Sequence, residues 1–248
     1  MYIFFRFTCV YSLIFVTFAD DNRTKTMTNK WIRRRLNAWG YGVQSPNDFY
    51  FVQHILREKL PYYAYTALEE MNRQSDPCLP NYPMVLNRLL FRLANYIQPK
   101  VIVEVGAGTS VMAMAMACPR AHCIAITANH KCNNALQRLM APYFHVEVKE
   151  GDEMAIFNQL LSEKMHISLL HVAHTPHYRE VVDMIQTYTG ERILIIIEGI
   201  DDSKAKHEWW SHLQESNLTG ITYDLGNVGL LFIDRSRHKE TYWINFRK

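Results

Sequence analysis

Short apolar runs alternate with amphipathic stretches along the chain beyond residue 100. Runs of β-branched and other apolar residues bounded by Gly, Pro or polar residues are typical of buried strands. Apolar residues that recur every three or four positions between the runs are typical of helices with one buried face. We therefore expect strands, separated by helices, over residues 101–105, 123–127, 144–149, 167–172 and 192–197.

The intervals between these strands carry helix boundary signals. Asn129 is placed to cap one helix, and Asp202 or Ser203 is placed to cap another. Thr175 opens a third helix, which Gly190 closes. The regular alternation of strand and helix predicts an α/β domain built on a mostly parallel sheet.

The last two apolar stretches, residues 221–234 and 242–246, are joined by a short polar link. A link this short cannot contain a crossover helix, so we expect the two strands to form an antiparallel pair. The predicted fold is a doubly wound, mostly parallel, seven-stranded α/β sheet that ends in an antiparallel C-terminal hairpin. A dinucleotide-binding sheet of the ordinary kind would be parallel throughout.

Helical patterns precede the first strand. Ser45 and Pro46 form a helix start signal, and a second helix is predicted over 83–97. We expect residues 27–98 to form an N-terminal helical cap over the mouth of the binding site, and residues 99–248 to form the main domain. Five aromatic residues of the cap are candidates to line a substrate pocket, although we favour a helix-core role for most of them: Trp39, Tyr41, Tyr62, Tyr63 and Tyr65.

Residues 1–26 form a hydrophobic leader that its composition sets apart. Its charge-free portion, residues 7–19, is short for a membrane span, and the basic residues that follow favour a cytoplasmic flank. We interpret the leader as a mis-assigned start upstream of Met27 or as disordered chain. A membrane anchor is the second interpretation and a signal peptide is the third. We therefore expect a cytoplasmic protein without a membrane partner.

The composition is that of an ordinary globular protein. The chain has 248 residues, of which 48% are hydrophobic and 21% are charged, and this suits one large α/β domain. The formal net charge of +3 and the isolated basic run at 33–35 argue against a nucleic-acid partner. The five cysteines form no C-x-x-C pair, so we expect reduced intracellular thiols.

The segment most indicative of chemistry is Glu104-Val-Gly-Ala-Gly108, at the end of the first predicted strand. Its two glycines let the backbone turn sharply and approach a ligand where a Cβ would clash. Thr109 or Ser110 can cap the helix that follows, whose free N–H groups would face a nucleotide-like ligand. A structural α/β turn in which Glu104 merely ends the strand is the alternative interpretation.

Two positions argue against a nicotinamide dinucleotide. The third small residue of a G-x-G-x-x-G fingerprint is Val111 here, and the second strand ends at Thr127 without an acidic ribose ligand. Instead, Glu-x-Gly-x-Gly followed by Thr and Ser resembles motif I of the class I S-adenosylmethionine-dependent methyltransferases, a Rossmann-like family. The resemblance implies S-adenosylmethionine as cofactor, with the Glu104 carboxylate near its cationic methionine end.

The resemblance covers most of the chain from about Trp31 onward and is to bacterial small-molecule O-methyltransferases. It includes Tyr41-Gly-Val-Gln-Ser-Pro46, Pro61-Tyr-Tyr-Ala-Tyr65 and the closing Val228-Gly-Leu-Leu-Phe-Ile233. It implies that eight residues contact the cofactor: Glu104, Gly106, Ala107, Gly108, Ser110, Thr127, Gly151 and Asp152. Of these, Gly151 and Asp152 are expected to lie near the adenine.

The chain departs from this family at positions that matter for the reaction. Thr127 stands where an acidic ribose ligand is usual, and its hydroxyl cannot hold two ribose hydroxyls as a carboxylate does. Metal-dependent members place an aspartate at the end of the fourth strand and an Asp-Asp or Asp-Asn pair after the fifth, where this chain has His171 and Glu198-Gly199. Because magnesium prefers oxygen ligands, we expect no metal and either a metal-independent reaction or a chain that has lost activity.

His171, His174 and His177 lie within seven residues and form a candidate site of their own. Softer metals accept imidazole ligands, but the helix start at Thr175 separates the three, so metal binding is the weaker interpretation. A histidine is well suited to removing a proton near neutral pH. We expect His171, His174 and Glu198 to be the catalytic groups at the carboxyl edge of the sheet, with one histidine as the base.

The predicted function is the transfer of a methyl group to a small-molecule acceptor, with a hydroxyl as the favoured acceptor group. A sulfonium already activates the methyl, so the protein mainly supplies positioning and deprotonation. A non-catalytic protein of the same fold that binds a ligand or a partner is the alternative, and a nicotinamide oxidoreductase is a distant third. The fold does not specify the acceptor. A homodimer is a further expectation.

Overall fold

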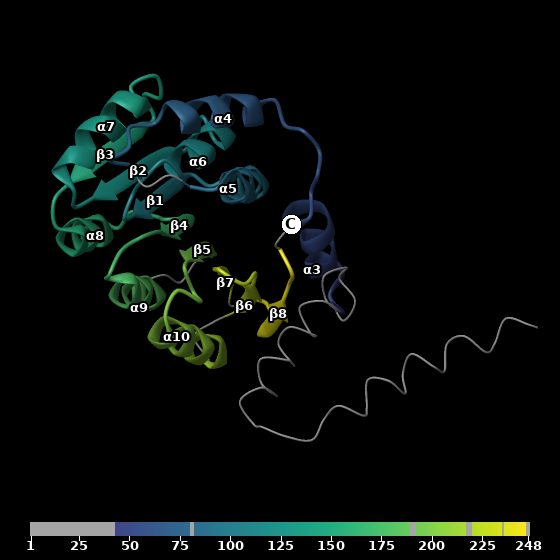
Figure 1. Cartoon of the computed structure of the whole chain (residues 1–248). Helices are drawn as coiled ribbons and strands as arrows, with labels where there is room; N and C mark the ends of the chain where they lie inside the picture. Colours follow the sequence, from purple (N-terminus) through teal and green to yellow (C-terminus); the bar gives the residue numbers. More distant parts are fainter. Residues whose placement is uncertain (1–42, 80–81, 189–191, 217–219, 235, 247–248) are drawn as a thin grey trace, which may run out of the picture.

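The structure is a computed structural model that describes residues 43–79, 82–188, 192–216, 220–234 and 236–246. In these residues eight strands form one sheet in the order β3-β2-β1-β4-β5-β7-β6-β8 (Figure 1). Strands β1 to β5 pair in parallel, whereas β7 is antiparallel to both of its neighbours. The strands are β1 (Val101–Val105), β2 (His122–Thr127), β3 (Val146–Glu150), β4 (Leu169–Val172), β5 (Ile193–Glu198), β6 (Ile221–Asp224), β7 (Val228–Ile233) and β8 (Glu240–Trp243).

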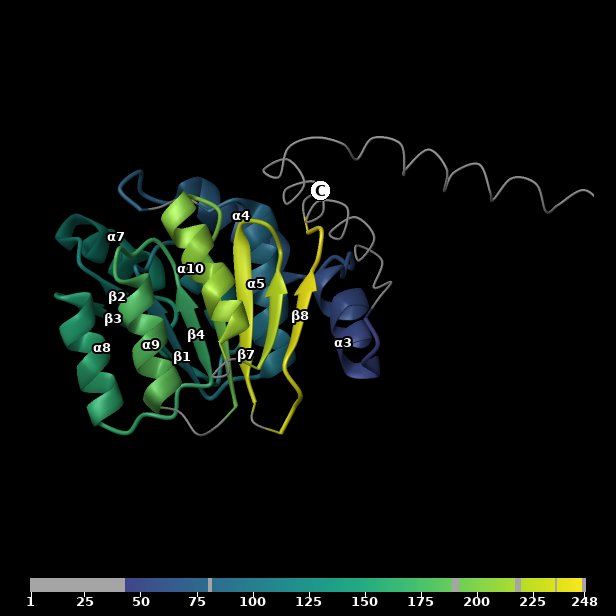
Figure 2. The ribbon, with the colours of Figure 1, turned by 90° about the horizontal axis from the view of Figure 1, so that it is seen from below.

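Helices cover both faces of this sheet. Helices α8, α9 and α10 lie on one face, and α4 to α7 lie on the other (Figures 1 and 2). The predicted doubly wound α/β fold is therefore confirmed. The helices are α3 (Pro46–Phe51), the π-helix η2 (Val52–Leu56), α4 (Ala64–Gln74), α5 (Met84–Ile97), α6 (Val111–Ala117), α7 (His130–Met140), α8 (Glu153–Ser162), α9 (Tyr178–Tyr188) and α10 (Lys204–Glu215).

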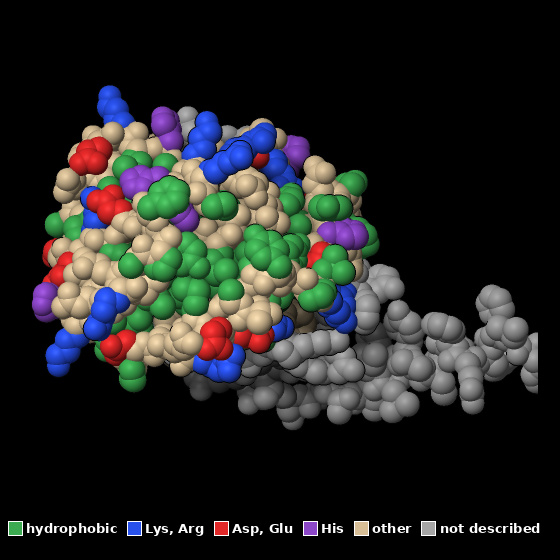
Figure 3. Space-filling model, turned by 90° about the horizontal axis from the view of Figure 1, so that it is seen from above, with side chains coloured by type: hydrophobic (Ala, Val, Ile, Leu, Met, Phe, Trp, Pro, Cys, Tyr) green, Lys and Arg blue, Asp and Glu red, His purple; other side chains and the backbone are tan. Residues whose placement is uncertain are grey.

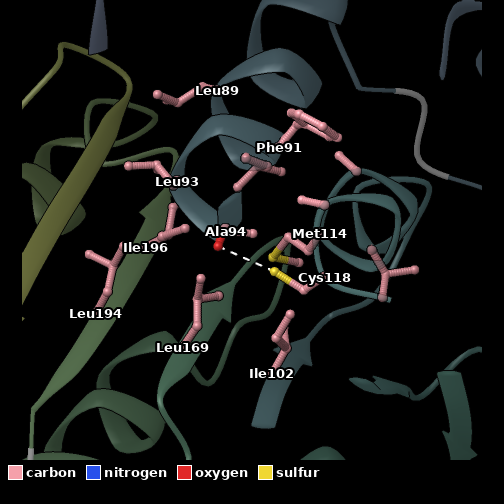
Figure 4. Packing of buried hydrophobic residues seen from close by; sticks show 14 of the residues in the cluster. Leu89, Phe91, Leu93, Ala94, Ile102, Met114, Cys118, Leu169, Leu194 and Ile196 are labelled. Carbon is pink, nitrogen blue, oxygen red and sulfur yellow. Dashed lines mark hydrogen bonds between the residues drawn. The ribbon is translucent and has the colours of Figure 1, made fainter. Parts of the chain in front are cut away.

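The sheet separates two hydrophobic cores. Side chains alternate between the faces of a strand, so Ile102 belongs to one core and Val103 to the other. Figure 4 shows the first core, in which Leu93 of α5 packs toward the sheet. In the same core the Cys118 thiol donates a hydrogen bond to the carbonyl oxygen of Ala94 at 3.2 Å and joins α6 to α5. Both faces of the central strands are thus fully buried, as continuous apolar runs predict.

The C-terminal strands differ from the prediction. Residues 221–234 form two strands, β6 and β7, because the chain turns at Gly226, which has a φ of +100°. The predicted pairing of this stretch with 242–246 is wrong: β8 spans Glu240–Trp243 and pairs in parallel with β6. The antiparallel hairpin is therefore β6–β7, and the sheet has one strand more than predicted. The turn was missed because Asp224, Gly226 and Asn227, which mark it, lie between two apolar runs that together resemble one strand.

Helix α3 is attached to the C-terminal strands through a buried carboxylate. Ser45 caps α3 as predicted, because its hydroxyl accepts a hydrogen bond from the Asp48 backbone N–H at 3.4 Å. The Asp48 side chain accepts hydrogen bonds from the Tyr223 and Tyr242 hydroxyls at 2.7 and 3.2 Å, and it pairs with Arg237 at 2.6 Å. These contacts fix the start of the described chain against β6 and β8.

The described part of the predicted cap packs on the sheet face that carries α6. Tyr62 and Tyr65 lie against Phe91 of α5, with ring centroids 5.2 and 5.7 Å apart, so they belong to the helix core. Tyr63 is 86% exposed and lines no core. Trp39, Tyr41 and the leader, residues 1–26, lie outside the described residues. The boundary at residue 98 stays a prediction.

The outer surface over α4 and α7 carries hydrophobic side chains near its middle and side chains of both charges around them (Figure 3). Charges of both signs on one face agree with the small net charge of the chain. No helix among the described residues combines the length and the apolar character needed to cross a bilayer. The expected homodimer stays a prediction.

Candidate active site at the carboxyl edge of the sheet

The glycine turn after β1 is organised around the carboxylate of Glu104. Its Oε1 accepts hydrogen bonds from the Gly108 backbone N–H at 3.1 Å and from the Ser110 hydroxyl at 2.7 Å. The predicted strand–turn–helix unit is present, but Ser110 does not cap α6 with its side chain, because its hydroxyl is bound to Glu104 instead. Glu104 is completely buried, so its charge must be balanced inside the protein.

Gly106 is the residue of this turn that requires glycine. Its φ is +79°, and a Cβ placed on it would lie 2.9 Å from both the carbonyl carbon and the carbonyl oxygen of His174. The backbone after β4 therefore packs directly against the turn after β1. This contact brings the end of β4, with its histidines, beside Glu104.

His171 lies between two carboxylates. Its Nδ1 is 3.2 Å from Oε2 of Glu104, and its Nε2 is 2.7 Å from Oε1 of Glu198. Neither contact is aligned as a hydrogen bond, so the two are close ion pairs. Burial opposes the charged imidazole, but the charges of Glu198 and Glu104 outweigh burial and raise the pKa of His171 to about 10. The raised pKa favours a charged imidazole near neutral pH, and the His171 side chain is completely buried. A catalytic role for His171 stays a prediction.

His174 lies at the surface end of the same cluster. Its side chain is 57% exposed, and its Nε2 is 3.7 Å from Oε2 of Glu198. The structure therefore brings His171, His174 and Glu198 together as predicted. His177 does not join them, and among the described residues no group of three His, Cys, Asp or Glu side chains is arranged to hold a metal ion.

Two residues that the sequence did not single out cover the glycine turn. The Tyr82 ring stacks on His174 with centroids 5.6 Å apart, and its buried hydroxyl has no hydrogen-bond partner among the described residues. Burial, followed by the charges of Glu198 and Glu104, raises the pKa of Tyr82. Asn72 at the end of α4 accepts a hydrogen bond from Thr109 at 3.4 Å and donates one to the Tyr82 carbonyl at 3.2 Å. The sequence signal that could have drawn attention to Tyr82 is its place between Pro80 and Pro83.

The residues predicted to face the ribose and the adenine lie at the ends of β2 and β3. Gly151 donates a hydrogen bond from its N–H to the carbonyl of Thr127 at 3.1 Å, so these two predicted residues are neighbours. The Thr127 hydroxyl accepts from the Asn129 N–H at 3.3 Å. Asp152 is exposed and caps α8, where its carboxylate accepts from the Ala155 N–H at 2.8 Å. The side chains on this side are therefore used in local turns and caps.

A buried lysine lies near the same edge. Lys206, in the first turn of α10, is 9% exposed, and its Nζ lies 4.6 Å from the centre of the Tyr178 ring. Burial lowers the pKa of Lys206, while the charges of Asp202 and Glu198 partly offset the effect. The sequence indicates a place for Lys206 only through the helical pattern that follows Ser203.

No family model matches the chain, and no curated protein matches it in sequence. Solved structures do resemble it. A methyltransferase from Geobacter sulfurreducens aligns at 19% identity with a TM-score of 0.53, over 73% of this chain and 95% of its own. The O-methyltransferase TomG from Streptomyces achromogenes, involved in tomaymycin synthesis and crystallised with S-adenosylmethionine, aligns at 17% identity with a TM-score of 0.54, over 77% and 97% of the two chains.

An O-methyltransferase from Bacillus cereus in complex with S-adenosylhomocysteine aligns at 12% identity with a TM-score of 0.56, over 78% of this chain and 99% of its own. The three structures are matched over nearly their whole lengths. Likeness at these identities establishes the fold. This chain has the fold of the class I O-methyltransferases.

Proposed function

We propose that the protein is an S-adenosylmethionine-dependent methyltransferase that transfers a methyl group to a small-molecule acceptor, with a hydroxyl as the favoured acceptor group. The observation that carries this proposal is the buried Glu104 carboxylate at the end of β1, held by the N–H of Gly108 and the hydroxyl of Ser110. The same fold is crystallised with S-adenosylmethionine in TomG. A carboxylate at this place is suited to a cationic ligand.

The residues present fit this cofactor. The Glu104 carboxylate and the Tyr82 hydroxyl are both buried beside the glycine turn, where they are placed to contact the polar methionine end of a ligand, although Oε2 of Glu104 is also paired with His171. Bound S-adenosylmethionine supplies a methyl group activated by its sulfonium. In this proposal the methionine end lies near Glu104, Gly106, Ala107, Gly108 and Ser110. The ribose and the adenine lie near Thr127, Gly151 and Asp152.

His174 and Glu198 are the proposed catalytic pair. His174 is exposed enough to meet an acceptor, and Glu198 lies beside it to orient the imidazole and to stabilise its protonated form. Because Nε2 faces Glu198, the other ring nitrogen of His174, Nδ1, would accept the proton of the acceptor hydroxyl, and the bound cofactor would supply the methyl group and leave as its demethylated product. A histidine base gives a rate that rises with pH as the imidazole loses its proton.

Metal independence is part of the proposal. Between Glu104 and Glu198 the chain places an imidazole rather than oxygen ligands, and hard cations such as magnesium prefer oxygen. Turnover should therefore be unchanged by EDTA. Loss of turnover in EDTA that magnesium or manganese restores would contradict this part of the proposal.

The binding site is tested with two glycine variants that share one backbone feature. Gly106 and Gly226 both have positive φ, but only a Cβ at Gly106 meets other atoms, those of His174. We expect Gly106→Ala to lose S-adenosylmethionine binding in equilibrium dialysis and Gly226→Ala to retain it. Equal affinity in the two variants would refute binding at this turn.

A non-catalytic binding protein is the second candidate, and one observation favours it. The glycine turn is buried beneath Tyr82 and Asn72, and Glu104 is already paired with His171. A panel of phenols, catechols and amines tested with labelled S-adenosylmethionine separates the two candidates. Methylated product from any member supports the enzyme, whereas cofactor binding without product from the panel favours the non-catalytic protein.

We further propose that the protein acts in the cytoplasm and that residues 1–26 are dispensable. The proposal rests on the composition of the leader and on Met27 as a natural start. A chain that begins at Met27 should be soluble and as stable as the longer one. Recovery of the full chain in a membrane fraction, or cleavage after Ala19, would overturn this proposal.

A further inference from the structure

Three neighbouring strands place a carboxylate, an imidazole and a second carboxylate side by side. Glu104 of β1 is the direct register partner of His171 of β4, and His171 is opposite Ile196 of β5. Glu198 lies two residues beyond Ile196, so its side chain points to the same face of the sheet as that of His171. The order carboxylate, imidazole, carboxylate therefore follows from the strand register and does not depend on a flexible loop.

The surroundings of His171 favour a charged imidazole. Nδ1 faces Glu104 at 3.2 Å and Nε2 faces Glu198 at 2.7 Å, and all three side chains are buried. A neutral imidazole has one N–H, so its other nitrogen would present a lone pair to a carboxylate. The doubly protonated ring presents a positive N–H edge to each of the two acids. A single charge between them also reduces the repulsion between Glu104 and Glu198.

Few other charged groups lie close enough to alter the balance between the imidazole charge of His171 and the two carboxylates. Lys206 from α10 acts on Glu198 from a distance, Tyr82 from the segment before α5 faces both acids, and His174 contacts the second Glu198 oxygen. Among these groups only His171 bridges the two carboxylates. With His174 neutral, the cluster of His171, Glu104 and Glu198 carries a net charge of −1.

We propose that His171 is a permanently charged positioning residue that links the cofactor-binding carboxylate Glu104 to the catalytic pair Glu198 and His174. The assignment of the two ends rests on the proposed function, whereas the charge state of His171 does not. The positive charge of its ring is shared between the ion pairs with Glu104 and Glu198, and His171 transfers no proton during turnover. Its charge weakens the pull of Glu198 on the imidazole of His174.

The charge state is tested first, on the full chain without any ligand. In ¹⁵N-histidine NMR spectra the signals of His171, identified by their absence in His171→Gln, should show both ring nitrogens protonated throughout about pH 5.5–8.5. The signals of exposed His122 and His130 serve as internal references in the same spectra. A neutral tautomer of His171, or a titration midpoint inside this range, would overturn the proposal. This test is independent of methyl transfer.

The link to the catalytic pair is tested by the pH dependence of turnover. Removing the charge in His171→Gln leaves Glu198 uncompensated, which stabilises protonated His174 and should move the acid limb of the kcat profile up by roughly half a pH unit or more. His171→Lys, which restores a positive charge, should move the limb back toward that of the natural protein. A neutral change at a remote histidine, His145→Gln, is the matched control.

The outcomes separate the two proposals. An unshifted limb in His171→Gln, or an equal shift in His145→Gln, contradicts the positioning role while leaving the methyltransferase proposal in place. Failure to bind S-adenosylmethionine refutes the proposed function, but the NMR result still decides the charge of His171. If His171→Gln does not fold, the His171 signals are assigned in the ligand-free natural protein from through-bond and through-space NMR correlations, and the test of its charge still stands.

Discussion

The two halves of the carboxyl edge are built differently. At the ends of β1, β4 and β5 three charged side chains are buried and in contact, and their positions follow from strand register. At the ends of β2 and β3 the polar side chains serve turns and caps, as Asp152 does at α8, or form a surface ion pair, as Glu150 does with His130. The first half therefore depends on electrostatics in a low-dielectric environment, whereas the second depends on backbone geometry.

This difference determines how substitutions act. Removing one member of a buried ion cluster leaves its partners unpaired, and the cost is large because water cannot replace the lost contact. Removing an exposed cap loses one hydrogen bond that water partly replaces. The four predictions below compare the two halves in order of expected effect.

The largest effect is expected for His171→Leu. This change leaves Glu104 and Glu198 buried without the cation between them, and it should lower the free energy of unfolding by about 3–5 kcal/mol in urea titrations. A triple variant with Glu104→Gln, His171→Gln and Glu198→Gln removes all the charges and should recover most of that loss. If His171→Leu is as stable as the natural protein, the ion cluster does not have the importance assigned to it.

The stability contributed by His171 should depend on pH. The pKa of its imidazole is raised from 6.5 to about 10, with burial opposing and the charges of Glu198 and Glu104 producing the rise. Because the folded pKa is raised, the contribution is complete below about pH 6.5 and is lost as the pH rises through about 10, by up to roughly 1.4 kcal/mol per pH unit. Urea unfolding of the natural protein and of His171→Gln should therefore converge between pH 7 and 10. A constant difference would contradict the raised pKa.

The next effect concerns turnover alone. His174→Ala removes the proposed base and should reduce kcat about 10²-fold while leaving the affinity for S-adenosylmethionine unchanged. His177→Ala, an exposed histidine of the same loop, is the control and should retain full activity. Full turnover in His174→Ala on an accepted substrate would show that another group removes the proton.

The smallest effect is expected on the other half of the edge. Asp152→Ala removes the cap of α8 and should cost about 1 kcal/mol of stability, with only a few-fold loss of cofactor affinity. Ser203→Ala removes the cap of α10 and gives the same loss of stability away from the adenine side. A hundredfold loss of affinity in Asp152→Ala alone would mean that its carboxylate contacts the cofactor directly.

Local sequence patterns predicted the parts of the molecule that local physics determines. The β1 strand, the turn at Gly106 and the helix that follows could be predicted because apolar runs, glycines and caps act within a few residues of one another. The turn at Gly226 was missed because apolar residues flank it on both sides without a strong break. The parallel pairing of β8 with β6 was also missed, since partner choice within a sheet is a tertiary property.

The sequence predicted which residues lie together in the candidate site, but not what each of them does. The ends of β4 and β5 were expected to lie together, and His171, His174 and Glu198 do. That His171 is completely buried between two acids depends on the register of three strands, which no local pattern contains. That Tyr82 covers the glycine turn depends on the path of the chain between α4 and α5, which the sequence pattern does not predict either.

The central claim is that Glu104 and the glycine turn bind S-adenosylmethionine. Isothermal titration calorimetry of the full chain with S-adenosylmethionine and, separately, with NAD tests it most directly, using Glu104→Gln as the site variant and exposed Glu147→Gln as the matched control. We expect saturable binding of S-adenosylmethionine to the natural protein and to Glu147→Gln, a loss of at least tenfold in affinity in Glu104→Gln, and no binding of NAD. Binding of NAD in preference, or an undiminished affinity in Glu104→Gln, would contradict it.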